Sequence, residues 1–279
     1  MELFVIIFLL CAGLVTGFLS GLLGVGGGFI CVPAVFFMLQ ECGVPQDTAL
    51  LAAFGTSLAC VFPTVLAGSL SHLRQGNVSM KNAVIIGITG AAMSFAGVFC
   101  AEHIPVRVLE ILFGCLLVLA AVKMISKSKA HAGENTEMKP VPCIFAGSAA
   151  GFLSGMLGVG GSALIVPVLS ILGKFSMRRA IGTSSFAIAF ITLGGVCAYS
   201  ISGAGIGVDL SVYGIFSVGF IALPMWLAFI ISSIPSAVFS SRVLHGKIPE
   251  RALRRIFAFL MVMIALDMFG VFAFIKAMI

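Results

Sequence analysis

Two glycine-rich stretches are the residues in this sequence best suited to bind a ligand. Gly24-Val-Gly-Gly-Gly28 recurs as Gly158-Val-Gly-Gly-Ser162. Each glycine costs about 1 kcal/mol relative to alanine in a helix interior, so a run of glycines predicts a break in the helix. The helix that restarts after such a break presents free backbone N–H groups and a partial positive charge, which bind anions. We therefore predict an anion-binding helix start in each stretch.

Two Gly-Thr-Ser stretches inside apolar segments add hydroxyl groups that suit an oxyanion. Gly55-Thr-Ser57 matches Gly182-Thr-Ser184. Two alternatives stay open: the glycines can serve close helix packing, and the hydroxyls can bond to carbonyls of their own helix. The predicted substrate-binding residues are Gly26, Gly27, Gly28, Thr56, Ser57, Gly160, Gly161, Ser162, Thr183 and Ser184.

Ionisable side chains inside apolar segments are expected to be functional in membrane proteins. Asp267 and Glu110 are the candidates here, and we assign both as residues that could carry a coupling proton. For Asp267, an ion pair with a loop arginine stays open as the alternative. No histidine lies in the middle of an apolar segment, and the eight cysteines form no Cys-x-x-Cys pair. The sequence therefore predicts neither an enzyme nor a bound metal or cofactor.

The composition places these residues in a lipid bilayer. The 279 residues are 60% hydrophobic and only 9% charged, whereas soluble domains carry about 25% charged residues. The net charge of +6 falls mainly in short loops, which is typical of membrane topology rather than of nucleic-acid binding. Six spans of about 20 residues or more are predicted. They cover residues 48–70, 80–101, 105–125, 180–202, 210–243 and 249–275.

The chain is internally duplicated. Beyond the glycine-rich and Gly-Thr-Ser matches, Ile104-Pro-Val-Arg107 matches Ile248-Pro-Glu-Arg251, and all three matches occur in the same order. We predict a first repeat over residues 1–125, a polar linker over 126–140 and a second repeat over 141–279.

Loop charges predict that the two repeats have opposite orientations. Arg74, Lys81 and the lysine-rich linker mark cytoplasmic loops, whereas the loop at residues 41–47 has no basic residue and faces outward. In the second half, the loop after the glycine-rich stretch carries Lys174 and is cytoplasmic. The N-terminus is therefore predicted outside and the linker inside the cell. The returning segment at residues 29–39 rises only about 16 Å, so it is either re-entrant or a short crossing helix.

The predicted fold class is all-α. It is a polytopic membrane protein of two inverted-topology repeats, each a glycine-broken helical hairpin followed by three transmembrane helices. Inverted repeats with broken helices are a recurrent architecture of secondary transporters.

With these motifs, nearly the whole chain resembles the TauE/SafE family of sulfite and organosulfonate exporters. The doubled Gly-Phe-Leu-Ser-Gly-x-Leu-Gly-Val-Gly-Gly motif carries the resemblance. The resemblance implies a carrier in the cell (inner) membrane for small sulfur-containing anions, usually working outward. The chain departs from the motif at one position, where the glycine at 28 becomes Ser162 in the second half.

The leading hypothesis is a proton-coupled secondary transporter that exports sulfite or organosulfonates by alternating access. A passive anion channel and an importer of a sulfur oxyanion such as thiosulfate stay open, as does an accessory subunit of another complex. The expected partners are a small sulfur anion and the lipid bilayer, without nucleic acid. The sequence leaves the oligomeric state open, a homo-oligomer included.

Overall fold

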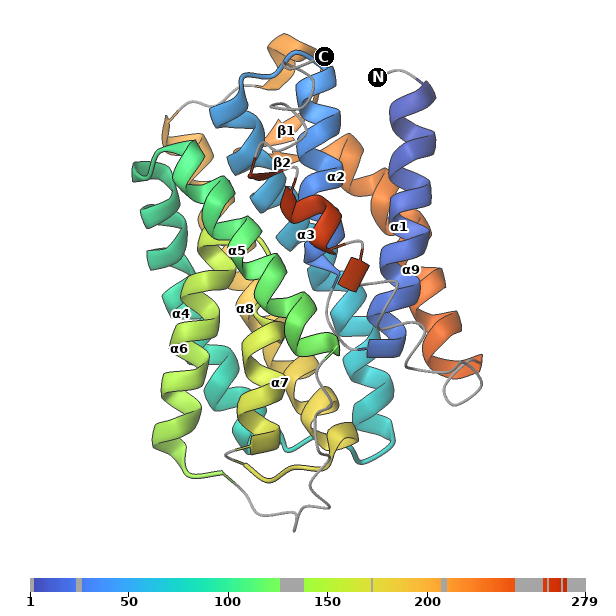
Figure 1. Cartoon of the computed structure of the whole chain (residues 1–279), viewed down its shortest axis with the longest axis vertical. Helices are drawn as coiled ribbons and strands as arrows, with labels where there is room; N and C mark the ends of the chain where they lie inside the picture. The colour runs from blue at the N-terminus through green and yellow to red at the C-terminus, as the bar shows by residue number, and fades with distance from the viewer. Residues whose placement is uncertain are drawn as a thin grey trace.

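A computed structural model describes residues 3–23, 27–125, 138–171, 173–206, 210–243, 258–259, 261–266 and 268–269. Almost all of them are helical (Figure 1). The helices of the first half are α1 (Leu3–Leu23), α2 (Gly28–Glu41), α3 (Gln46–Arg74), α4 (Met80–His103) and α5 (Val106–Ile125). Those of the second half are α6 (Pro140–Leu157), α7 (Ser162–Ile171), α8 (Met177–Ile206) and α9 (Leu223–Val243), followed by short helical pieces between 258 and 268.

Five helices in the described part are long and apolar enough to cross a membrane: α3, α4, α6, α8 and α9. Large apolar side chains such as Phe99, Phe145 and Ile201 lie exposed on the outside of the bundle, where lipid would cover them. α3 is the most enclosed of the five, because 78% of its apolar stretch is buried inside the protein. The chain is a polytopic membrane protein whose centre is α3.

The first helices of the two halves run in opposite directions. In Figure 1, α1 starts beside the N-terminus at the top and runs downward, whereas α6 starts at the bottom and runs upward. α1 packs on α9, α6 packs on α4, and α3 and α8 pack on each other. When the two halves are exchanged, the contact of α1 with α9 corresponds to the contact of α6 with α4. The contact of α3 with α8 corresponds to itself.

Glycines let the outer helix pairs pack closely, and they do so in the same way twice. A Cβ atom on Gly13 of α1 would overlap Ser232 Oγ of α9, and a Cβ atom on Gly147 of α6 would overlap Thr89 Oγ1 of α4. One turn further on, Gly17 and Gly151 come equally close to the backbones of Ser233 and Gly90. The packing role of the small residues is therefore confirmed at Gly17 and Gly151.

The expected span at residues 210–243 is wrong in its first part. A short 3-10 helix (Leu210–Tyr213) and a two-stranded antiparallel pair, β1 (Ser217–Val218) with β2 (Ile221–Ala222), precede α9. Gly214 and Gly219 adopt positive φ angles of 72° and 58°, which a helix does not contain. The apolar residues before Leu223 therefore form an ordered connection that packs on α8 and α3. The helix itself begins only at Leu223.

Candidate functional site

The first glycine-rich stretch ends one helix and starts the next. α1 ends at Leu23, and α2 begins at Gly28 after Gly27, whose φ of +77° is left-handed. The Gly27 carbonyl accepts the N–H groups of Ile30 and Cys31 at 3.2 Å, which starts the helix. The predicted helix break is confirmed here. Of the predicted residues, Gly26 lies outside the described part of the chain.

The second stretch forms the same break between α6 and α7. Gly158 ends α6 with φ +68°, and Gly160 and Gly161 also have positive φ angles. The Gly161 carbonyl accepts the N–H groups of Leu164 and Ile165 at the start of α7. Ser162 is the first residue of α7. This backbone path needs glycine, because a left-handed conformation costs other residues about 1–2 kcal/mol.

The two breaks touch each other. A Cβ atom on Gly28 would lie 2.8 Å from the Cα of Val159 and 3.0 Å from the carbonyl oxygen of Gly158. Only a glycine at position 28 allows the start of α2 to approach the second break this closely. Segments about 130 positions apart in the sequence thus meet inside the bundle, where α2 starts and α6 ends.

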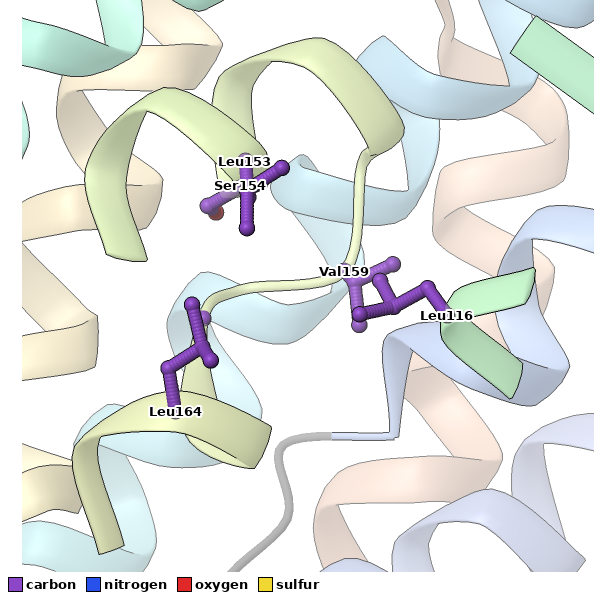
Figure 2. Close-up of a pocket in the computed structure, with 6 residues that line it drawn as sticks. Leu116, Leu153, Ser154, Val159 and Leu164 are labelled. Carbon is purple, nitrogen blue, oxygen red and sulfur yellow. The ribbon is translucent and has the colours of Figure 1, made fainter. Parts of the chain in front are cut away.

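A small cavity lies beside this contact (Figure 2). It has room for about one water molecule. The Oγ of Ser154 is buried and lacks a hydrogen-bond partner in the described part of the chain. The lining carries no charged side chain, and it consists of Leu116, Leu153, Ser154, Val159, Gly161 and Leu164.

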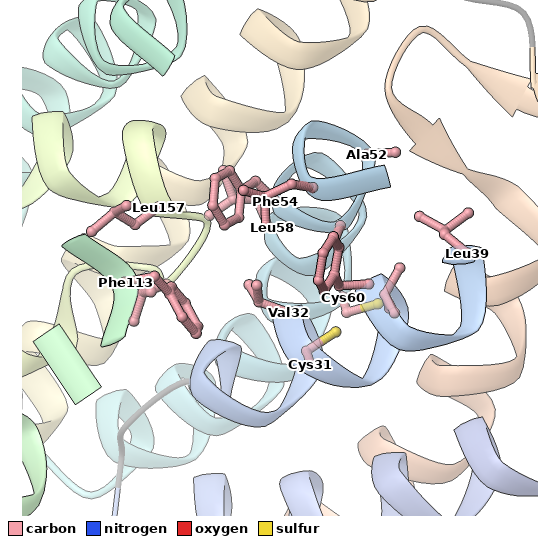
Figure 3. Close-up of a cluster of buried hydrophobic side chains, with 14 of the residues drawn as sticks. Cys31, Val32, Leu39, Ala52, Phe54, Leu58, Cys60, Phe113 and Leu157 are labelled. Carbon is pink, nitrogen blue, oxygen red and sulfur yellow. The ribbon is translucent and has the colours of Figure 1, made fainter. Parts of the chain in front are cut away.

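Large apolar side chains separate the breaks from water. Phe54 of α3 and Phe113 of α5 are fully buried, and their ring centroids lie 6.1 Å apart (Figure 3). Leu157 of α6, Leu58 of α3 and Val32 of α2 belong to the same cluster. Electrostatic interactions are stronger in such a dry environment than in water. Backbone N–H groups and hydroxyls near the breaks are therefore effective donors for a small anion.

The threonines of the two Gly-Thr-Ser stretches make equivalent bonds across the halves. Thr56 Oγ1 accepts the backbone N–H of Ala222 at 2.9 Å, directly before α9. Thr183 Oγ1 accepts the backbone N–H of Ser79 at 3.0 Å, directly before α4. Both threonines are fully buried. Each hydroxyl thus stabilises the start of a helix that belongs to the other half.

The glycines and serines beside these threonines have partly equivalent environments. A Cβ atom on Gly55 would lie 3.2 Å from the carbonyl oxygen of Phe220, and one on Gly182 would overlap that of Asn77. Ser57 Oγ donates to the carbonyl oxygen of Gly158 at 2.9 Å, so it holds the second break. Ser184 Oγ donates to Ile181 O of its own helix at 3.0 Å, which is the alternative that the sequence left open.

We expect Thr56→Val and Thr183→Val each to lower the free energy of unfolding by about 1–3 kcal/mol, because each leaves a buried N–H without an acceptor. Thermal unfolding of the purified protein in detergent measures the change. Thr192→Val is the matched control, because this equally buried hydroxyl donates only to carbonyls of its own helix, Ile188 and Ala189. Equal losses in all three variants would contradict the role of the cross-half bonds.

Of the two carboxylates that we expected to carry a proton, the structure describes only Glu110. Asp267 lies outside the described residues. Glu110 is 4% exposed, and its carboxylate accepts bonds from Arg107 at 2.9 Å and from Gln46. Arg107 also donates to the carbonyl oxygens of Met268 and Phe269. Glu110 therefore belongs to an ion pair that joins α5 to the end of the chain.

Sequence reasoning missed Tyr199 near the site, and it considered His72 only as a residue at a cytoplasmic mouth that could attract anions. Tyr199 is fully buried on α8, and its hydroxyl donates to Gly155 O at 2.9 Å. A Cβ atom added to Gly55 would lie 3.1 Å from the Cβ of Tyr199. A Cβ atom added to Gly182 would lie 3.1 Å from the Cβ of His72. The repeat contained the signal, because Tyr199 and His72 follow their Gly-Thr-Ser stretches at the same spacing.

Comparison with known proteins identifies a family and several similar membrane transporters. The family model described as "Sulfite exporter TauE/SafE" matches residues 9–268. A probable membrane transporter protein of Methanocaldococcus jannaschii is 30% identical over 247 residues, covering 88% of each chain. A probable membrane transporter protein of Haemophilus influenzae is 28% identical, covering 95% of this chain and 98% of its own.

A third relative, YdhB of Bacillus subtilis, is also named a probable membrane transporter protein and is 33% identical over 67% of this chain. These relatives are transporters by name, and the family model spans almost all of the described helices. The chain is therefore a multi-pass membrane transporter rather than an enzyme, and it belongs to the TauE/SafE sulfite exporter family.

Proposed function

We propose that this transporter exports small sulfur-containing anions, such as sulfite or organosulfonates, by proton-coupled alternating access. The observation that carries the proposal is the contact between the two glycine breaks, Gly28 against Gly158 and Val159. It places the start of α2 against the break that precedes α7, and the N–H groups and dipole of a helix start favour an anion. The family to which the chain belongs suggests that the anion contains sulfur.

The donors proposed for the substrate are neutral. They are the backbone around residues 26–28 and 160–162, and the hydroxyl of Ser154 beside them. The hydroxyls of Thr56, Ser57, Thr183 and Ser184 make protein hydrogen bonds, so we propose that they hold the breaks in place and contact the anion only after those bonds open. Neutral donors suit a carrier, because substrate that binds to a fixed buried charge is released slowly.

The proposal includes two inverted repeats over residues 1–125 and 141–279. The opposite directions of α1 and α6 and the exchangeable helix contacts support it. The cavity at the breaks holds about one water and is smaller than sulfite. We therefore propose that the described state is closed, and that the halves move apart at the breaks to admit the anion from one side at a time.

The test is transport by purified protein in liposomes. Sulfite, thiosulfate and methanesulfonate are loaded inside, with sulfate as a comparison anion, and efflux is recorded with and without a pH gradient. We expect saturable efflux of sulfite or methanesulfonate that the pH gradient accelerates. Absence of flux for every sulfur anion would contradict the function, and unsaturable currents of single channels would replace the carrier by a channel.

Ser154→Ala tests the position of the site in the same liposomes. Hydrogen bonds to charged groups contribute about 1.5–3 kcal/mol, so the variant should raise the KM for the transported anion about tenfold or more. Ser200→Ala is the control, because Ser200 Oγ already donates to Val196 O of its own helix. An unchanged KM in Ser154→Ala would move the site away from the second break.

A further inference from the structure

A third carboxylate, Glu102, connects the two halves at the end of the bundle opposite the linker. It lies in the last turn of α4 and is partly buried. Its Oε1 accepts a hydrogen bond from the hydroxyl of Ser202 on α8. Because α4 belongs to the first half and α8 to the second, this bond crosses the interface that alternating access would have to rearrange.

Glu102 differs from Glu110 in having no arginine or lysine partner in the described part of the chain. Glu110 has an ion pair with Arg107. The helices packed against α4 near Glu102 offer no such partner, because α6 contains no charged residue and the arginines of α8 lie at its other end. A proton that binds to Glu102 therefore changes the charge of this interface without breaking an ion pair to arginine or lysine.

Two titratable side chains face Glu102. His103 follows it on α4, and its ring lies against Phe99 with Nδ1 at 2.8 Å from Phe99 O. Tyr199 lies one turn deeper than Ser202 on α8. Asp209, in the connection after α8, lies outside the described residues.

Tyr199 connects this end of α8 to the cavity. Its hydroxyl donates to the carbonyl oxygen of Gly155, and the preceding residue is Ser154, whose unpartnered Oγ lines the cavity. Its Cβ also lies 3.1 Å from the Cβ position of Gly55, so it packs on the first Gly-Thr-Ser stretch. A change in the contact between α4 and α8 at Glu102 therefore reaches the end of α6, beside the second break, and the first Gly-Thr-Ser stretch through one buried side chain.

We propose that Glu102 is the residue that binds the coupling proton, an inference that rests on the proposed transport function. A proton from water outside binds a carboxylate oxygen of Glu102, and the neutral acid then donates to Ser202 Oγ instead of accepting from it. Neutral Glu102 can enter the dry interface at low cost, whereas the charged form cannot. The proton leaves to water on the other side once α4 and α8 have moved, and the anion crosses in the opposite direction.

The test compares two modes of transport in liposomes, with sulfite and with methanesulfonate, whose charge does not change across the pH range. Net efflux driven by an inward proton gradient requires the proton to bind and to leave. Exchange of labelled for unlabelled anion at equal pH requires only the movement of loaded protein. We expect Glu102→Gln to reduce gradient-driven efflux at least tenfold while exchange stays within about twofold of wild type.

Matched variants separate coupling from a structural effect. Glu110→Gln removes the buried carboxylate of the ion pair and should keep gradient-driven efflux per folded molecule. Ser202→Ala removes a donor to the charged form, so the pH of half-maximal efflux should move upward. Should Glu102→Gln fail to fold, Glu102→Asp keeps the carboxylate at a shorter reach and should retain gradient-driven efflux with a shifted pH profile.

The outcomes distinguish this inference from the proposed function. Gradient-driven efflux that survives in Glu102→Gln overturns the role of Glu102 and leaves the transporter assignment intact. Loss of gradient-driven efflux in Glu102→Asp, or efflux with an unshifted pH profile, also overturns it. Wild-type protein that moves neither sulfite nor methanesulfonate overturns the proposed function, and the inference falls with it.

Discussion

Gly158→Ala should strongly lower the free energy of unfolding of the protein. The left-handed backbone, with φ +68°, costs an alanine about 1–2 kcal/mol. Its Cβ would also lie 2.7 Å from the Cα of Phe54, and overpacking of this kind typically costs about 1–3 kcal/mol. The sum, about 2–5 kcal/mol, is a large share of the roughly 5–15 kcal/mol that stabilises a typical protein. The thermal unfolding temperature in detergent and the yield of monodisperse protein measure the loss.

Two other glycines are matched controls for Gly158→Ala. Gly43 has a φ of +81° with nothing within 4 Å of the Cβ position, so alanine there adds backbone strain alone. Gly68, inside α3, has an ordinary helical φ and open space, so alanine should be neutral or stabilise by about 0.5–1 kcal/mol. A Gly158→Ala variant that is no less stable than Gly43→Ala would contradict the close packing of the second break on Phe54.

Arg107→Met should have the second-largest effect on stability. The variant leaves the carboxylate of Glu110, whose side chain is 5% exposed, without its cation. Removing one partner of a buried pair costs about 3–5 kcal/mol, and the half-exposed Arg107 places this pair at the low end of that range. The bonds to Met268 O and Phe269 O are lost as well. We expect a large fall in unfolding temperature and faster proteolysis at the C-terminal end.

The control is Glu110→Gln, which leaves the arginine without a carboxylate. Arg107 is 56% exposed, so water solvates its charge and the expected loss is about 1 kcal/mol or less. The exposed Arg74, which has no ion pair among the described residues, provides a second control as Arg74→Met. Equal stability of Arg107→Met and Glu110→Gln would show that Glu110 is not held by this pair.

The sequence alone predicted the helix breaks, because a run of glycines has a local and direct effect on the backbone. The breaks appear between α1 and α2 and between α6 and α7 as expected, and α2 is short. Which residues fill the space between the breaks was not predictable in the same way. The bonds of Thr56 and Thr183 to the starts of α9 and α4 join segments more than 100 positions apart, and no local pattern encodes them.

The errors have physical causes. Residues 210–222 were assigned to a span because they are apolar, but Gly214 and Gly219 turn the chain and allow it to pack on other helices. Glu102 was passed over because it stands at a helix end, where a charge usually faces water. Only the packing of α4 on α8 brings it against Ser202. Asp267 and the inverted orientation of the repeats stay predictions.

The paired threonine bonds have an evolutionary consequence. Thr56 binds the chain before α9 and Thr183 binds the chain before α4, which is the reciprocal pattern of a two-fold symmetric dimer interface. A single gene for a half-length ancestor would have been enough for both bonds. Two copies of its product, inserted into the membrane in opposite orientations, would each bind the other through the same threonine. Fusion through the linker would then have preserved contacts that already existed. It also freed the two copies to diverge, as position 28 and position 162 have done.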